Sequence, residues 1–114
     1  MATIYGIKNC DTMKKAFKWL DEKGVEYDFH DYKKNGVDEK ILKKAVKKFS
    51  WEQVFNRKGM TWRKLPKDVQ SAMDEKKAIV IALENPSIIK RPLLIHNKEM
   101  VLGFNAETYE KMFL

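Results

Sequence analysis

The residue of this sequence best suited to covalent chemistry is its one cysteine, Cys10. A short β-branched and aromatic run, Thr3-Ile4-Tyr5, precedes it, and Gly6 marks the end of that run. Beyond the cysteine, apolar residues recur at helical spacing, at Met13, Ala16, Phe17 and Leu20. Cys10 is therefore predicted at the N-terminus of a helix that directly follows a strand. Backbone N–H groups and the helix dipole favour a thiolate there, which lowers the thiol pKa and makes the sulfur nucleophilic.

The other interpretation of Cys10 is a small buried hydrophobe, which is the commoner role of a lone cysteine. The residues around it are polar, which favours the reactive interpretation: Lys8, Asn9, Asp11 and Thr12. Residue types alone leave both interpretations open.

Composition narrows the class of protein. A chain of 114 residues with 44% hydrophobic content is expected to be one domain with its own core. One cysteine excludes an internal disulfide, and together with the scattered His30 and His96 it excludes a multi-cysteine zinc site, so no metal is expected. The longest apolar run, residues 78–83, is too short to span a membrane, and no signal peptide opens the sequence. A cytoplasmic location without membrane association is expected.

The net charge of +7 comes from 23 basic and 16 acidic residues. Much of the excess is lysine on one predicted helix, at Lys40, Lys43, Lys44, Lys47 and Lys48. Such a face is usually solvated, and a nucleic-acid footprint is the less favoured alternative because aromatic residues do not interleave with the lysines. Nucleic acid is not expected as a partner, whereas small anions or acidic proteins fit the charge.

The first third of the chain is predicted to form a βαβ unit. Residues 25–31 alternate, with Val25, Tyr27 and Phe29 on one face, which indicates a half-buried strand. Gly24 is placed to end the preceding helix. The two strands should be parallel. Residues 33–36 are predicted to form a polar turn.

Residues 38–85 are predicted to be an all-helical insertion. Asp38 can cap a helix whose apolar face carries Ile41, Leu42, Ala45, Val46 and Phe49. Ser50 to Gln53 is typical of a capping box that starts another helix. Asp74 can cap a helix that runs to about Asn85 and ends before Pro86.

Strands return in the last third. Residues 92–96 and 99–102 are two apolar runs separated by Asn97-Lys98, the length of a tight hairpin. Asn105 can cap a final helix. The Arg91–Pro92 peptide bond stands at the start of the third strand, where either a cis bond or an ordinary trans bond fits the sequence.

This order of parts resembles the thioredoxin fold: an α/β fold with a βαβ unit, a C-terminal β-hairpin and helix, and here an all-helical insertion between the second and third strands. Residues 4–12 and 88–94, together with Arg57, resemble the ArsC/Spx family, whose members include arsenate reductases and thiol-dependent transcription regulators. Four separated motifs, at residues 6–12, 29–32, 61–65 and 88–94, resemble one subgroup of that family. The resemblance is strongest to its YffB-type subgroup, proposed to be glutathione-dependent thiol reductases. It implies one ArsC-like domain over residues 1–114, with a core of 1–37 and 86–114 and an insertion of 38–85.

The resemblance also implies roles for individual residues. Cys10 matches the catalytic cysteine, and Asn9 and Thr12 lie in the active-site loop. Arg57 and Arg91 match two arginines that hold the oxyanion in arsenate reductases, and Pro92 matches the cis proline of the fold. These five residues other than Cys10 are therefore expected to bind substrate. On residue types alone, the two arginines are equally compatible with a solvated surface.

Three positions differ from the family pattern. The second cysteine of the regulators is replaced by Met13, and a histidine that precedes the cysteine in arsenate reductases is replaced by Gly6. The third anion-binding arginine corresponds to Phe104. These differences argue against arsenate as the substrate and against a dithiol switch.

The resemblance therefore predicts a monothiol oxidoreductase with no bound cofactor. An external thiol must resolve any adduct on Cys10, because the chain has no second cysteine. Glutathione, as co-substrate, or a glutaredoxin-like donor is the expected partner. The alternative is a non-catalytic regulator that binds RNA polymerase, as in the Spx branch of the family.

Overall fold

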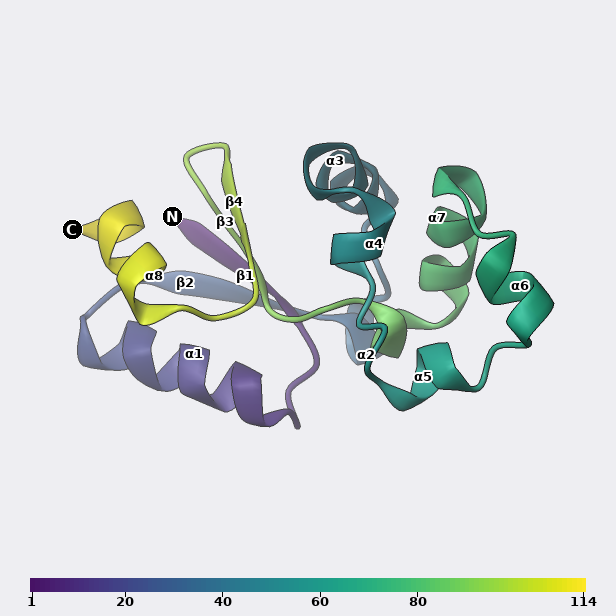
Figure 1. Ribbon diagram of the computed structural model, residues 1–114. Helices are drawn as coiled ribbons and strands as arrows, with labels where there is room; N and C mark the ends of the chain where they lie inside the picture. The colour runs from purple at the N-terminus through teal and green to yellow at the C-terminus, as the bar shows by residue number, and fades with distance from the viewer. The chain divides into compact units, whose positions relative to one another are not determined.

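The computed structural model describes residues 1–114, which form two compact units (Figure 1). Unit 1 consists of residues 1–35 and 91–114, and unit 2 of residues 36–90. The division therefore lies at 35/36 and 90/91, compared with 37/38 and 85/86 in the domain division expected from the family resemblance.

Unit 1 is built on a four-stranded mixed sheet with the order β2-β1-β3-β4. Its strands are β1 (Ala2–Gly6), β2 (Tyr27–Asp31), β3 (Leu93–His96) and β4 (Glu99–Leu102). β1 pairs in parallel with β2 and antiparallel with β3, and β3 pairs antiparallel with β4. The predicted βαβ unit and C-terminal hairpin are confirmed, and the fold is thioredoxin-like.

Two helices, α1 (Asp11–Glu22) and α8 (Ala106–Phe113), pack on one face of this sheet (Figure 1). Trp19 of α1 contacts Tyr109 and Phe113 of α8 with ring centroids 5.6 and 6.3 Å apart. The buried core draws on both helices and on two strands, through Ala2, Ile4, Met13, Ala16, Leu20, Leu94 and Tyr109. Burial of this shared apolar face fixes α1 against β1, which positions the turn that joins them.

The turns of unit 1 follow from their residues. Gly24 ends α1 with φ +68°, and the N–H groups of Gly24 and Val25 donate to the carbonyls of Asp21 and Leu20. This is a Schellman ending, and because it uses Val25, β2 begins at Tyr27 rather than at Val25 as predicted. At the β3–β4 hairpin, Asn97 and Lys98 both have positive φ, as a two-residue type I′ turn requires.

Unit 2 is helical, as predicted for most of its length. Its elements are α3 (Glu39–Phe49), α4 (Trp51–Val54), α5 (Met60–Arg63), α6 (Lys67–Ser71), α7 (Glu75–Glu84) and the 3₁₀ helix η1 (Pro86–Ile88). An isolated antiparallel bridge joins Phe55 to Ile89. None of the helices in either unit combines the length and the apolar character needed to cross a membrane.

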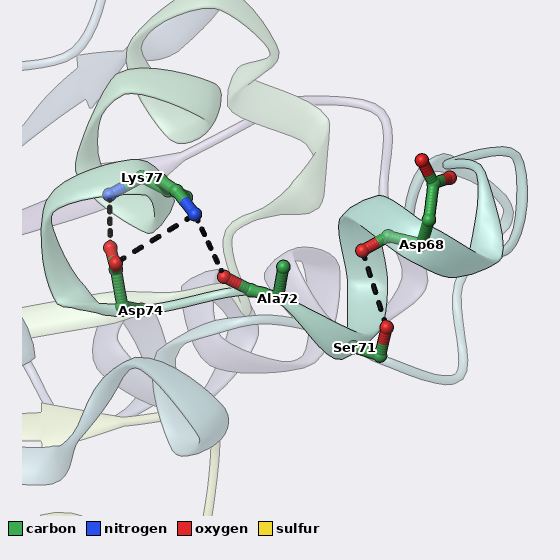
Figure 2. A network of polar contacts seen from close by, with 5 residues as sticks. All are labelled: Asp68, Ser71, Ala72, Asp74 and Lys77. Carbon is green, nitrogen blue, oxygen red and sulfur yellow. Dashed lines mark hydrogen bonds and ion pairs between the residues drawn. The ribbon is translucent and has the colours of Figure 1, made fainter.

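Side-chain caps start the two longest helices of unit 2. Asp38 accepts hydrogen bonds from the N–H groups of Lys40 and Ile41, and Asp74 accepts one from the N–H of Lys77 at 2.8 Å. Figure 2 shows that Lys77 also folds back, so that its Nζ donates to the Ala72 carbonyl at 3.1 Å. Both predicted caps are confirmed, as is the Asn105 cap of α8 in unit 1.

Two local predictions are wrong. The polar turn predicted at 33–36 is part of a one-turn helix in unit 1, α2 (Tyr32–Asn35), because the Asp31 carboxylate accepts a hydrogen bond from the Lys33 N–H and caps it. The capping box predicted at Ser50 does not form, although α4 does begin there. Ser50 has φ +80°, and its N–H closes the end of α3 on the Val46 carbonyl, so its side chain is not placed to cap α4.

Candidate active site

Cys10 is the N-cap residue of α1, as predicted, with an extended backbone conformation (φ −146°, ψ 133°). Its carbonyl accepts the first hydrogen bond of the helix, from the Lys14 N–H at 3.0 Å, while its N–H donates to the Lys8 carbonyl at 3.1 Å. The side chain is half-buried, and Lys8 and Asn9 before it are exposed. The sulfur therefore lies over the open first turn of α1 and can be reached from solvent.

The surroundings of the Cys10 sulfur favour the thiolate. Partial burial by itself raises the pKa of the thiol, but the nearby Met13 N–H, the Arg91 side chain and the Thr12 N–H favour the thiolate and lower the pKa. The positive charge of Arg91 acts in the same direction, and the net result is a pKa below that of an ordinary cysteine. Burial as an inert hydrophobe does not describe this residue.

Arg91 reaches the cysteine because of the sheet register. Tyr5 of β1 pairs with Leu93 of β3, so Arg91, two residues before Leu93, lies beside the end of β1. A Cβ placed on Gly6 would be 3.4 Å from the Arg91 Cβ, which shows how closely the two segments approach. The Arg91–Pro92 bond is cis, as the family resemblance implies, and Pro92 is fully buried with its carbonyl accepting from the Gly103 N–H at 2.7 Å.

Arg57 belongs to unit 2, where it is exposed. Its guanidinium lies over the Trp51 ring, 5.8 Å from the centroid, in a cation–π arrangement. Trp51 in turn contacts Phe55 and Trp62, so the arginine is stacked on an aromatic cluster. The structure thus brings Cys10, Thr12 and Arg91 together within unit 1, and the role of Arg57 in the same site stays a prediction.

Sequence reasoning gave no role to Tyr32, which lies at the same end of the sheet. Gly6 pairs with Asp31, so Tyr32 comes directly beside the end of β1. Its side chain is 4% exposed, and burial raises the pKa of its phenol; the Tyr5 phenol adds to the rise, and the Arg91 guanidinium opposes it. The sequence signal that pointed to this residue was the motif at residues 29–32. Its alternating pattern indicates a strand but does not predict the one-turn helix that begins at Tyr32.

The sequence profile of the ArsC family matches residues 5–112. The chain belongs to the ArsC family. Among solved structures, the YFFB protein superposes with a TM-score of 0.93 at 46% identity, with 97% of each chain covered. An arsenate reductase (ArsC) related protein from Brucella melitensis has a TM-score of 0.78 at 50% identity, covering 98% of this chain and 93% of that one. The global transcriptional regulator Spx of Streptococcus mutans is 26% identical over 109 residues, or 94% of this chain and 79% of that protein.

Two of the three differences from the expected ArsC pattern lie next to each other in this structure. A Cβ on Gly6 would lie 2.5 Å from the Met13 Sδ and 2.8 Å from its Cε, so the buried Met13 side chain fills the space that a side chain at residue 6 would need. Phe104, at the third position, packs edge-on against Tyr109 with centroids 5.0 Å apart. In this member of the ArsC family, the side chains of Met13 and Phe104 make apolar contacts, and Gly6 has no side chain. None of the three positions therefore supplies a second thiol or a charged group.

Proposed function

We propose that this ArsC-family protein is a glutathione-dependent thiol–disulfide oxidoreductase in which Cys10 is the single nucleophile. The observation that carries the proposal is the half-buried Cys10 at the N-terminus of α1, where the Met13 and Thr12 amides and the Arg91 side chain favour the thiolate and lower the pKa of the thiol. Thiolate, rather than thiol, attacks disulfides, so a lowered pKa supplies the reactive form at neutral pH.

The reaction runs in two thiol–disulfide exchanges. The Cys10 thiolate attacks the glutathione sulfur of a mixed disulfide between glutathione and a substrate thiol; that S–S bond breaks, a Cys10–glutathione disulfide forms, and the substrate leaves as a thiolate that takes a proton from water. A glutathione thiolate then attacks this adduct, releasing oxidised glutathione and regenerating the Cys10 thiolate. In the net reaction, the substrate sulfur is reduced from the disulfide to the thiol level and the sulfur of the incoming glutathione is oxidised to the disulfide level, while the glutathione sulfur of the original mixed disulfide stays at the disulfide level throughout.

Glutathione fits the charge of the proposed site. It carries two carboxylates, and Arg91 and the start of α1 both favour anions. The predicted binding residues Asn9 and Thr12 lie in the turn and first helical turn beside the thiol, and Pro92 presents the start of β3. A peptide backbone can pair with a strand-like segment, which here would be Arg91, because Arg91 is only partly buried whereas Pro92 is buried and its carbonyl already accepts from the Gly103 N–H.

The direct test is intact mass after incubation with oxidised glutathione. We expect one glutathionyl group on the protein, its removal by reduced glutathione, and no adduct on Cys10→Ser. A protein that stays unmodified, or a serine variant that is modified equally, would contradict the proposal.

Arg57 can be tested separately, because its guanidinium lies over the Trp51 ring. If Arg57 binds a glutathione carboxylate, titration with reduced glutathione should change the tryptophan fluorescence, and Arg57→Ala and Trp51→Phe should both remove that change. The matched control is Arg63→Ala, which removes an arginine of α5. An unchanged signal in the wild type would exclude Arg57 from the glutathione site.

A second candidate function is a non-catalytic regulator that binds RNA polymerase. The similarity to a protein named as a global transcriptional regulator favours it, and the lysines of α3 offer a basic surface. Purified RNA polymerase that binds the wild type and Cys10→Ser equally well, together with a failed glutathione adduct, would favour this candidate over the enzyme.

A further inference from the structure

The last α-helix of unit 2, α7, contains an unbroken apolar run, so that apolar side chains lie on all of its sides. Its two alanines, Ala78 and Ala82, are completely buried, and α7 packs beside α3 of the same unit (Figure 1). The larger side chains remain accessible, since Val80 is 55% exposed and Ile79 and Ile81 are only half-buried. The outer face of an ordinary surface helix is polar instead. The accessible face of α7 therefore has the composition of a face that another molecule covers.

Two open grooves border these aliphatic side chains, and both lie within unit 2. The first, of about 290 Å³, is lined by Lys76, Lys77, Val80 and Ile81. The second, of about 300 Å³, is lined by three lysines of α3 and two residues of α7, namely Lys43, Lys44, Lys47, Glu75 and Ile79. Most of the surface of both grooves is aliphatic carbon. A groove between two packed helices is a place where the side chains of a third helix can insert.

The charge around the two grooves is mainly positive. Of their five lysines, Lys43 pairs with Glu39 at 2.8 Å, and the Lys77 Nζ lies 4.0 Å from an Asp74 carboxylate oxygen. The other three form no ion pair, namely Lys44, Lys47 and Lys76. Glu75 is the one acidic residue that lines either groove. A molecule that covers this surface is therefore favoured if it brings negative charges beside apolar groups.

We infer that the α3–α7 surface, defined by the residues that line these two grooves, binds an acidic amphipathic helix of a partner protein. Aliphatic side chains of that helix contact Ile79 and Val80, and its carboxylates pair with the three lysines that form no ion pair in the free protein. Apolar residues at helical spacing supply the contact area in this mode of recognition, and the charges around them supply specificity. The inference goes beyond the proposed function, because it needs neither Cys10 nor glutathione.

Three other occupants fit the α3–α7 surface less well. A second copy of this chain would bring the same lysines against one another, in a protein with a net charge of +7. Single-stranded nucleic acid binds through aromatic side chains on which bases stack, and none lines either groove. An anionic membrane takes up a continuous apolar helix face, whereas the aliphatic side chains here line grooves between lysines.

The test is a titration of the ¹⁵N-labelled full-length protein with a synthetic acidic helix, followed by the amide chemical shifts. The probe peptide has about 14 residues, with leucine at positions i, i+3, i+4 and i+7 and glutamate elsewhere. A control peptide of the same composition distributes its leucines around the helix, and a second control replaces every glutamate by lysine. We expect the probe to shift amides of α3 and α7, the first control to bind about tenfold more weakly, and the second not to bind. No shifts with the probe, or equal binding of either control, would overturn the inference.

Charge reversal on the protein tests the role of the lysines. The triple variant Lys44→Glu, Lys47→Glu and Lys76→Glu should bind the probe at least tenfold more weakly, because it replaces three attractive charges by repulsive ones. The matched control reverses three exposed lysines of unit 2 that line neither groove, Lys40→Glu, Lys64→Glu and Lys67→Glu. Both variants change the net charge equally, so an equal loss of binding in the two would mean that only the overall charge matters, and would overturn the inference.

Val80→Asp tests the apolar contact at a position whose exposure lets the fold tolerate the change. It should weaken binding of the probe about tenfold, since burial of a valine side chain is lost and a like charge faces the probe. Wild-type affinity in Val80→Asp would contradict the predicted contact. Two further outcomes would assign the surface to another occupant: binding to phosphatidylserine vesicles but not to the probe, or sedimentation as a dimer that Val80→Asp dissociates. A failed glutathione adduct would leave the inference standing, because none of these variants alters Cys10.

Discussion

The two units of the chain use their polar groups differently. In unit 1, groups from two distant segments act on one thiol, because the amides at the start of α1 and the side chain of Arg91, before β3, both favour the Cys10 thiolate. In unit 2, the side-chain bonds that start α3 and α7 join residues two or three positions apart, at Asp38 and Asp74. Local bonds build helices, but a reactive site needs contacts that only the pairing of distant strands can supply.

The chemistry of Cys10 is controlled from within unit 1. The groups that lower the pKa of its thiol, namely the Thr12 and Met13 amides and Arg91, all belong to that unit. Damage to the core of unit 1 should therefore change both stability and the thiol, whereas equal damage to unit 2 should change stability alone.

Two core truncations give the largest expected effect. Met13→Ala and Leu42→Ala each remove a large side chain from a buried position, one in each unit, and should lower the free energy of unfolding by about 2–5 kcal/mol. Met13→Ala should also raise the midpoint of Cys10 alkylation, because the cavity under Gly6 loosens the turn that holds the sulfur over the helix amides. Urea unfolding and the pH dependence of alkylation measure the two effects.

Leu42→Ala serves as the control, with a similar loss of stability and an unchanged midpoint. If Leu42→Ala moved the midpoint of Cys10 alkylation as far as Met13→Ala does, unit 2 would influence the thiol as strongly as unit 1, and control of the thiol from within unit 1 would be contradicted.

The same contrast explains what could be predicted from sequence. The ends of α3 and α7 follow from Asp38 and Asp74, because a cap and the periodic residues after it are neighbours in the chain. The place of Cys10 at the start of α1 is local in the same sense. In contrast, α2 is a single turn, too short to show a period, and depends on the Asp31 side chain.

The contact between Arg91 and Cys10 could not be derived from either segment alone. It depends on the register of β1 with β3, and the family resemblance was the signal that pointed to it. The close packing of the Met13 side chain against Gly6 could not be predicted for the same reason. Seven positions separate the two residues in the sequence, and only the packing of α1 on β1 brings them together.

A smaller effect is expected from a buried hydrogen bond between elements of unit 1. The Tyr109 hydroxyl of α8 donates to the Gly103 carbonyl after β4 at 3.1 Å. Tyr109→Phe leaves that buried carbonyl unpaired and should cost about 1–2 kcal/mol. Tyr27→Phe removes an exposed bond to Asp21 and should change stability by less than about 0.5 kcal/mol. Thermal or urea unfolding of both variants would test the difference, and equal losses would contradict it.

Unit 2 offers the opposite kind of change, a local gain. Ser50 has φ +80° and ψ 153°, a conformation that costs an L-residue about 1–3 kcal/mol and that glycine adopts readily. Ser50→Gly should therefore stabilise the protein, by about 0.5–1 kcal/mol after the added freedom of glycine in the unfolded chain is subtracted. Ser50→Ala keeps the Cβ and should bring no gain. A destabilised glycine variant would show that the Ser50 side chain does more than the structure indicates.

The smallest expected effect is the dependence of stability on the ionisation of Cys10. Its pKa is lowered in the folded protein, so folding favours the thiolate. This contribution is fully present above the pKa of an unfolded cysteine, about 8.5, and is lost as the pH falls through the folded pKa. Because the side chain is half-buried, solvent screening keeps the contribution small.

The measurement is the difference in unfolding free energy between the wild type and Cys10→Ser across this range. The difference should move in favour of the wild type as the pH rises from below the folded pKa of Cys10 to about 8.5. Burial is the main cause that raises the pKa values of the Tyr32 and Tyr109 phenols, so their contribution to the free energy of unfolding falls only above about pH 10. Both tyrosines are present in both proteins, so this contribution cancels in the difference. A difference that instead favoured the wild type more at low pH would mean that folding favours the thiol, so that burial, which raises the pKa of Cys10, outweighs the amides and Arg91, which lower it.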